Sequence, residues 1–107
     1  MAAQLPDATL TLAQWQAFIK QRTIDRGFQD ESVQDEFMLL VEEVGELAKA
    51  MRPLNGITYA TDSQKLELEH EAADVFWLLT CVCNSLGIDL AEAVRSKEAK
   101  NNTRTWK

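Results

Sequence analysis

Two acidic stretches inside otherwise apolar helical segments constrain the fold of this chain more than any other feature. The first, EEVGE at residues 42–46, lies within residues 37–51, and the second, EAAD at residues 71–74, lies within residues 66–86. Apolar residues recur at helical spacing in both segments and form one stripe on each predicted helix. Two carboxylates three residues apart lie on the flank of each stripe, offset in the same sense. Solubility alone does not explain acids beside a core face.

Carboxylates at i and i+3 share a helix face, so each pair can present both groups in one direction. If the two helices pack antiparallel, Glu43, Glu46, Glu71 and Asp74 converge. Carboxylates that close raise one another's pKa unless a cation lies among them. The set suits Mg²⁺, which takes oxygen ligands and completes its shell with water and substrate phosphates. The alternative is a solvated acidic face with incidental spacing.

The only histidine of the chain raises a second metal hypothesis. Glu67 and His70 form an ExxH motif, and di-iron carboxylate sites in helix bundles use two such motifs with two further glutamates. One chain cannot build that site, although a dimer can supply the second histidine. The helical wheel places His70 beyond the acidic flank, toward solvent, which disfavours the di-iron hypothesis.

Composition is that of a globular protein, and 107 residues suit a single domain spanning residues 1–107, with residues 1–9 as a loose arm. A net charge of −6 argues against nonspecific nucleic-acid binding. Neither a signal peptide nor a segment long enough to span a membrane is visible. Cys81 and Cys83 cannot pair with each other on one helix and are interpreted as core or interface thiols, so we expect a cytoplasmic protein.

The charge is unevenly distributed. Residues 95–107 contain five basic side chains and one acidic, a net of +4, so the rest of the chain carries −10. Lys97, Asn101 and Arg104 recur at i, i+4 and i+7, so they share a helix face if the helix persists as far as Arg104. Arginine binds phosphate in bidentate fashion, and lysine adds a point charge. These cations either bind a polyphosphate at the acidic site or simply complement the end of the last helix.

Four helices are predicted, separated by Gly27, by the loop at residues 53–61 with its Asn55-Gly56 turn, and by Gly87. We expect them at about residues 10–26, 32–51, 62–85 and 89–101, with N-caps at Ser32, at Asp62 or Ser63, and at Asp89. The 53–61 loop is either a lid or a plain connector. Gly45 inside the second helix indicates either close approach of a backbone or ligand, or ordinary packing.

Two tryptophans have open interpretations. Trp15 suits the core or a subunit interface, and Trp77 falls outside the main apolar stripe of its helix and suits an interface. Either ring can instead form the wall of a nucleobase pocket. Both are therefore candidate substrate-binding residues.

The two acidic motifs carry a resemblance to a known family. Glu43-Val-Gly-Glu46, 24 residues, and then Glu71-Ala-Ala-Asp74 resemble the ExxE…ExxD signature of the MazG-like all-α nucleoside triphosphate pyrophosphohydrolases. The neighbouring words at residues 40–50 and 86–93 match as well, and so do Lys97, Asn101 and Arg104. The resemblance covers roughly residues 12–105 and is closest to the short, single-domain members.

The resemblance implies an all-α four-helix bundle assembled as a homo-oligomer, either dimer or tetramer, with sites near subunit interfaces. It implies hydrolysis of a (d)NTP between the α and β phosphates to a (d)NMP and pyrophosphate, in the removal of noncanonical or surplus deoxynucleotides. Glu43, Glu46, Glu71 and Asp74 would bind Mg²⁺, with Mn²⁺ as a potential substitute. Glu43 or Glu46 would also activate the water, with Glu42 as an outer partner.

A non-catalytic helical module is the alternative from another class. Such a protein would use its acidic face to bind a partner or a metal. Neither a glycine-rich phosphate loop nor a Ser/His/Asp set is present, so nucleotide binding would depend on metal and side chains.

Overall fold

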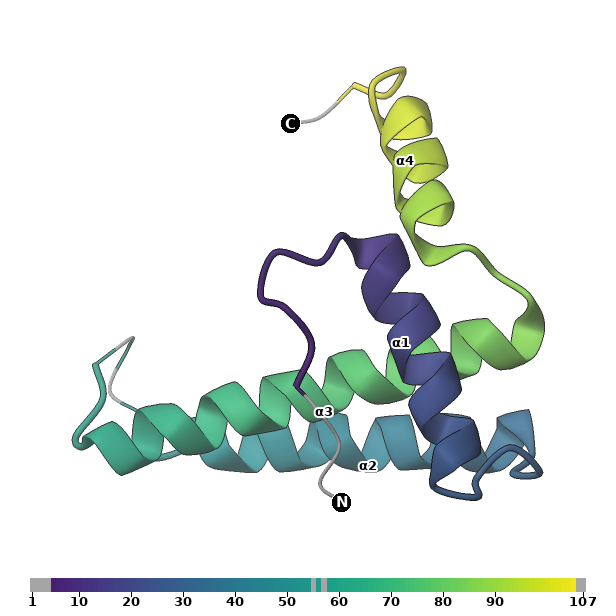
Figure 1. Ribbon diagram of the computed structural model, residues 1–107. Helices are drawn as coiled ribbons and strands as arrows, with labels where there is room; N and C mark the ends of the chain where they lie inside the picture. Colours follow the sequence, from purple (N-terminus) through teal and green to yellow (C-terminus); the bar gives the residue numbers. More distant parts are fainter. Residues whose placement is uncertain (1–4, 55, 57, 106–107) are drawn as a thin grey trace.

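Four α-helices make up the computed structural model, which describes residues 5–54, 56 and 58–105 (Figure 1). They are α1 (Leu12–Asp25), α2 (Val33–Met51), α3 (Asp62–Leu86) and α4 (Leu90–Asn101). The predicted all-α class is confirmed, and the four predicted helices are found within one or two residues of their expected bounds. Asn55 of the predicted turn, residues 1–4 of the predicted arm and Lys107 of the basic segment lie outside the described residues.

Side-chain caps set where the helices begin. Ser32 and Asp89 cap α2 and α4 as predicted, since their side chains accept hydrogen bonds from the backbone N–H groups three residues on. The predicted cap of α3 at Asp62 or Ser63 is wrong, because the Thr61 hydroxyl takes that role at 3.1 Å from the Gln64 N–H. Asp62 then lies in the first turn, where the helix dipole favours a carboxylate.

The α2 and α3 helices form a long antiparallel pair, and α1 crosses over it (Figure 1). Ile19 of α1 and Thr80 of α3 are fully buried where these helices meet. Cys81 and Cys83 are also buried as free thiols, and burial raises the pKa of both. The core therefore lies beneath α1, toward the C-terminal half of α3.

The α4 helix points away from the α2–α3 pair and packs on α1 (Figure 1). Gln16 of α1 fixes the bend between α3 and α4: its amide donates to the Ile88 carbonyl at 2.7 Å and accepts from the Leu90 N–H at 2.9 Å. Because α4 departs in this way, the helices do not close into a bundle within the described chain. The bundle that we predicted would need contacts from another copy.

Much apolar surface on the α2–α3 pair is uncovered. Phe37, Val41 and Val44 of α2 and Leu66 and Leu79 of α3 are all exposed. The radius of gyration is 16.4 Å, whereas a compact chain of this length has about 13 Å. A Cβ built on Gly45 would meet nothing within 4 Å, so no close approach explains this glycine within the described residues.

Among the described residues, no single helix is long and apolar enough to cross a bilayer; the α3 and α4 pair, bent by 94°, passes that test only when both are taken together.

Candidate functional site

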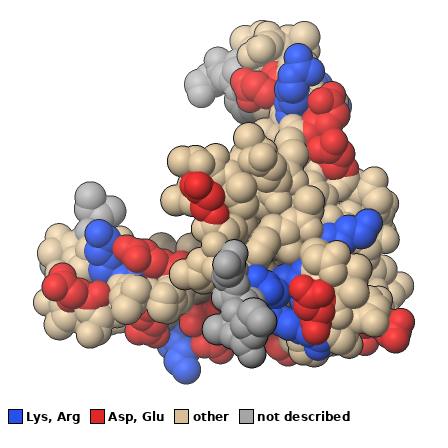
Figure 2. Space-filling model, viewed as in Figure 1, with Lys and Arg blue, Asp and Glu red and all other residues tan. Residues whose placement is uncertain are grey.

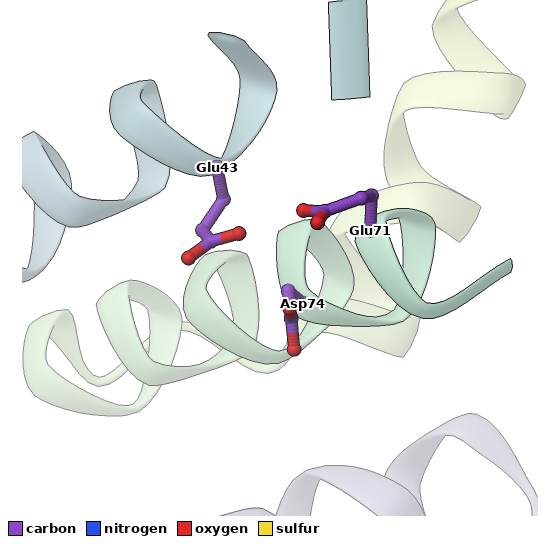
Figure 3. A group of neighbouring side chains, drawn as sticks. All are labelled: Glu43, Glu71 and Asp74. Carbon is purple, nitrogen blue, oxygen red and sulfur yellow. The ribbon is translucent and has the colours of Figure 1, made fainter. Parts of the chain in front are cut away.

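Three carboxylates from the two predicted acidic motifs meet between α2 and α3. Glu43 reaches from α2 toward α3, where Glu71 and Asp74 lie one helical turn apart (Figure 3). One oxygen from each of the three lies within 4.8 Å of the others. The antiparallel pairing brings motifs 28 residues apart into one site, as the helical wheel predicted. This spacing is open enough for a divalent cation to draw the oxygens inward.

The flank position of these acids explains their partial burial. Glu43 and Glu71 are half-buried beside the apolar contact of α2 with α3, and Asp74 is exposed. Half-burial removes part of the hydration of a carboxylate while leaving one side open to a ligand. The three carboxylates therefore lie at the edge of the helix pair, where Asp74 is open to solvent.

The environment of Glu43 disfavours its charge. Partial burial raises the pKa of Glu43, and the negative charge of Asp74 adds to the effect. Glu71 raises it further through a shared hydrogen bond and its charge, and Glu46 contributes last. A cation among these groups would reverse the balance, because it stabilises every ionised carboxylate around it.

Glu71 provides a direct test of whether the residues fit a metal. Its Oε2 atom is buried and has no hydrogen-bond partner among the described residues. A buried carboxylate oxygen without a partner is costly, whereas a hard divalent cation would satisfy it. The three carboxylates, with a buried and unpartnered oxygen on Glu71, therefore fit Mg²⁺ or a similar ion whose other ligands are water and phosphate.

The other predicted acidic ligand lies outside this group. Glu46 is exposed on the next turn of α2 and is not among the three carboxylates within 4.8 Å. Glu42 and His70 are exposed as well and do not join the group. The wheel predicted the direction of these side chains, but it could not predict which of them reach the same point.

The predicted phosphate-binding residues do not lie at the acids of their own chain. Lys97 is exposed on α4, which packs on α1 and projects from the body of the molecule (Figure 1). Asn101 is the last residue of α4 and Arg104 lies three residues beyond it, so the helix face that these residues were predicted to share does not extend to Arg104. Figure 2 shows both signs of charge along α4, and acidic side chains spread over the α2–α3 pair.

The two candidate tryptophans lie on either side of Phe18. Trp15 meets the Phe18 ring edge-on at 5.8 Å between centroids, and Trp77 meets it edge-on at 6.3 Å. The Arg26 guanidinium lies 5.3 Å from the centre of the Trp77 ring. Both tryptophans are half-buried, so Trp77 is less exposed than its wheel position predicted.

Glu36 is a buried acidic residue that was not among the predicted site residues. It is only 4% exposed, and its carboxylate accepts a hydrogen bond from the Ser85 hydroxyl of α3. Its position seven residues before Glu43 places both on one face of α2, and this spacing was the signal available in the sequence. Glu36 is thus a buried acid on the same stripe as the candidate site.

Comparison with known proteins identifies the family. A model of the MazG nucleotide pyrophosphohydrolase domain matches residues 18–107, most of the chain. The chain belongs to this family. The matched model describes a nucleotide pyrophosphohydrolase domain, and Glu43, Glu71 and Asp74 form a group that could hold a metal ion.

One relative is an uncharacterized protein, YpjD, of Bacillus subtilis (strain 168). It is 42% identical over 67 residues, which cover 61% of this chain and 60% of that protein. The match therefore spans less than two thirds of the relative's own length. The assignment of this chain to the MazG family therefore rests on the match to the domain model. YpjD adds a related sequence without a stated activity.

Proposed function

We propose that this chain hydrolyses a (d)NTP between the α and β phosphates, giving a (d)NMP and pyrophosphate, with Mg²⁺ as the working metal. The observation that carries the proposal is the convergence of Glu43, Glu71 and Asp74, with a buried and unpartnered oxygen on Glu71. In a cell this reaction would remove noncanonical or surplus deoxynucleotides.

The carboxylates divide into two roles in this proposal. Glu43, Glu71 and Asp74 would hold the cation, which when bound would neutralise phosphate charge and lower the pKa of water. Glu46, one turn further along α2, is the candidate to orient the attacking water and accept its proton. The water oxygen attacks the α phosphorus, the bond to the bridging oxygen breaks, and pyrophosphate leaves with that electron pair.

The shape of the chain supports a homo-oligomer. Apolar side chains stay uncovered on the α2–α3 pair, and the chain is more extended than a compact domain of its length. We propose that a second copy covers this face, with a dimer as the smallest assembly. In this arrangement, α4 of one copy brings Lys97, Asn101 and Arg104 to the phosphates bound at the acids of the other.

Mixing two inactive variants tests this arrangement. Glu71→Gln removes an acid, and Lys97→Ala removes a cation. If the site combines acids of one copy with α4 of the other, a mixed dimer restores one complete site and part of the activity returns. Two variants that stay inactive after unfolding and refolding together would show that each chain uses its own α4.

The decisive experiment measures pyrophosphate and monophosphate released from a panel of canonical and modified dNTPs with Mg²⁺. Equal amounts of both products establish the position of cleavage. Glu71→Gln should reduce turnover by at least the ~10- to 100-fold seen when metal-site partners are lost. Glu69→Gln is the matched control, since Glu69 is exposed and pairs only with Lys65 at 3.8 Å among the ion pairs of the described residues.

One result would contradict the proposed hydrolysis of a (d)NTP. A folded protein that binds Mg²⁺ but releases neither product from any nucleotide would contradict the proposal. It would favour a helical module that binds metal or a partner without catalysis.

A further inference from the structure

A pair of adjoining cavities surrounds Glu36 beneath α1. Their volumes are about 190 and 210 Å³, and both are lined by Thr23, Phe28, Glu36 and Cys81. A cavity of about 150 Å³ accommodates a benzene ring, so each has room for a planar base. The buried carboxylate of Glu36 is therefore part of an internal surface large enough for a ligand.

The position of this cavity along the helices relates it to the acidic site. Leu39 and Leu78 line the second cavity, of about 210 Å³. Leu39 lies four residues from Glu43 on α2, and Leu78 lies four residues from Asp74 on α3. Glu36 itself lies seven residues from Glu43, about 10 Å along the axis of α2. A ligand with its phosphates at Glu43 and an extended body along the pair would reach Glu36 with its far end.

The lining suits an aromatic heterocycle. Phe28 provides a flat ring at the wall of the second cavity, and base stacking on such rings is sequence-tolerant. Trp77 also lines this cavity, with the Arg26 guanidinium 5.3 Å from its ring centre. Gln29 and Asn84 also line the adjoining cavity, and the Asn84 amide is hydrogen-bonded to Gln16. Arg26 and Glu31 also line the second cavity, and Glu36 is the buried acid of the lining, whose carboxylate form accepts hydrogen bonds. The preferred base would then depend on which hydrogen-bond donors each base offers to Glu36.

We infer that this cavity receives the nucleobase and that Glu36 selects bases carrying an amino group, an inference that rests on the proposed nucleotide substrate. Guanine offers adjacent N1–H and N2–H donors, and cytosine and adenine each offer one amino group. Thymine carries carbonyl oxygens where these bases carry an amino group, and its single ring donor, N3–H, lies between two carbonyl oxygens that repel the carboxylate. The Ser85 hydroxyl holds Glu36 in place and leaves the remaining acceptor positions of the carboxylate for the base.

The test measures binding of dGMP, dCMP, dAMP and dTMP to the full chain without metal, by calorimetry or ligand NMR. Wild type should bind the amino-bearing nucleotides about tenfold or more tightly than dTMP, the value of one charged hydrogen bond. Glu36→Gln keeps an oxygen for Ser85 and presents an amide N–H₂ instead. It should abolish the difference or reverse it in favour of dTMP.

Measurements of binding and of turnover distinguish the inferred base cavity from the proposed hydrolysis reaction. Discrimination among the monophosphates without any pyrophosphate release would support the base cavity and contradict the proposed reaction. Turnover of all dNTPs with the same KM in wild type and in Glu36→Gln would contradict the base cavity and leave the reaction intact. If Glu36→Gln fails to fold, equal binding of all four monophosphates to wild type still overturns the inference.

Discussion

Glu36 and Glu43 lie on one face of α2, two turns apart, but their surroundings differ in burial and in the groups that face each carboxylate. Glu36 is buried and accepts a hydrogen bond from Ser85. Glu43 is half-buried and faces two further carboxylates, which raise its pKa. A carboxylate with a hydrogen-bond donor stabilises the fold that holds it, whereas a carboxylate among acids does so only with a cation. In the two proposals above, this difference distinguishes the residue that would select the base, Glu36, from a residue that would hold the metal, Glu43.

Metal binding should give the largest effect on the acidic region. If Glu43, Glu71 and Asp74 hold Mg²⁺, a concentration of about 100 Kd adds about 2.7 kcal/mol to the free energy of unfolding. Thermal melts with and without Mg²⁺ measure the shift, which should disappear in Glu71→Gln. An equal Mg²⁺ shift in wild type and Glu71→Gln would mean that the ion binds elsewhere.

Loss of the Glu36 side chain should destabilise the protein. Glu36→Ala leaves the Ser85 hydroxyl without its buried acceptor and empties space beneath α1, at a cost of about 1–3 kcal/mol. Urea unfolding measures the change, with Glu69→Ala as the exposed control on α3. An unchanged unfolding midpoint would show that Glu36 does not join α2 to α3.

Gly45 tests whether the acidic region stays uncovered. A Cβ there meets nothing within 4 Å in one chain, so Gly45→Ala should stabilise α2 by up to about 1 kcal/mol if the face is free. If a second copy packs against this turn, the same change should weaken assembly instead. Unfolding measured across protein concentrations distinguishes the two, because only an assembly makes the midpoint depend on concentration.

The smallest effect should come from Glu43 in the absence of metal. Its pKa is raised in the folded state, so the folded protein binds that proton more tightly than the unfolded chain does. Stability from this group is therefore present at acid pH and is lost as the pH rises through the folded pKa. Glu43→Gln should stabilise the metal-free protein at neutral pH by a few tenths of a kcal/mol to about 1 kcal/mol.

The pH series checks the sign of this prediction. Wild type without metal should lose stability relative to Glu43→Gln as pH rises from the acid range to neutrality. With saturating Mg²⁺ the order should reverse, because the carboxylate then contributes to the ion. A Glu43→Gln variant less stable than wild type in chelator at neutral pH would mean that this carboxylate is favourably paired.

Local patterns in the sequence predicted the helices and their approximate ends. The apolar periodicity, the N-caps Ser32 and Asp89, and the C-cap Gly87 depend on interactions within one or two helical turns. They can therefore be recognised without knowledge of the fold. The cap of α3 was misplaced by one or two residues because Thr61, Asp62 and Ser63 are all good caps. The spacing of each acidic pair is equally local, and the convergence of the two motifs followed from antiparallel packing.

The sequence by itself determined four helices, two acidic pairs beside core faces, and a family whose members hydrolyse nucleotides. Only the tertiary structure decided that Glu43, Glu71 and Asp74 meet while Glu46 stays apart. It also decided that Glu36 finds Ser85 and that α4 departs from the acids. These outcomes depend on how one helix is placed against another, and that placement comes from contacts between residues far apart in the chain.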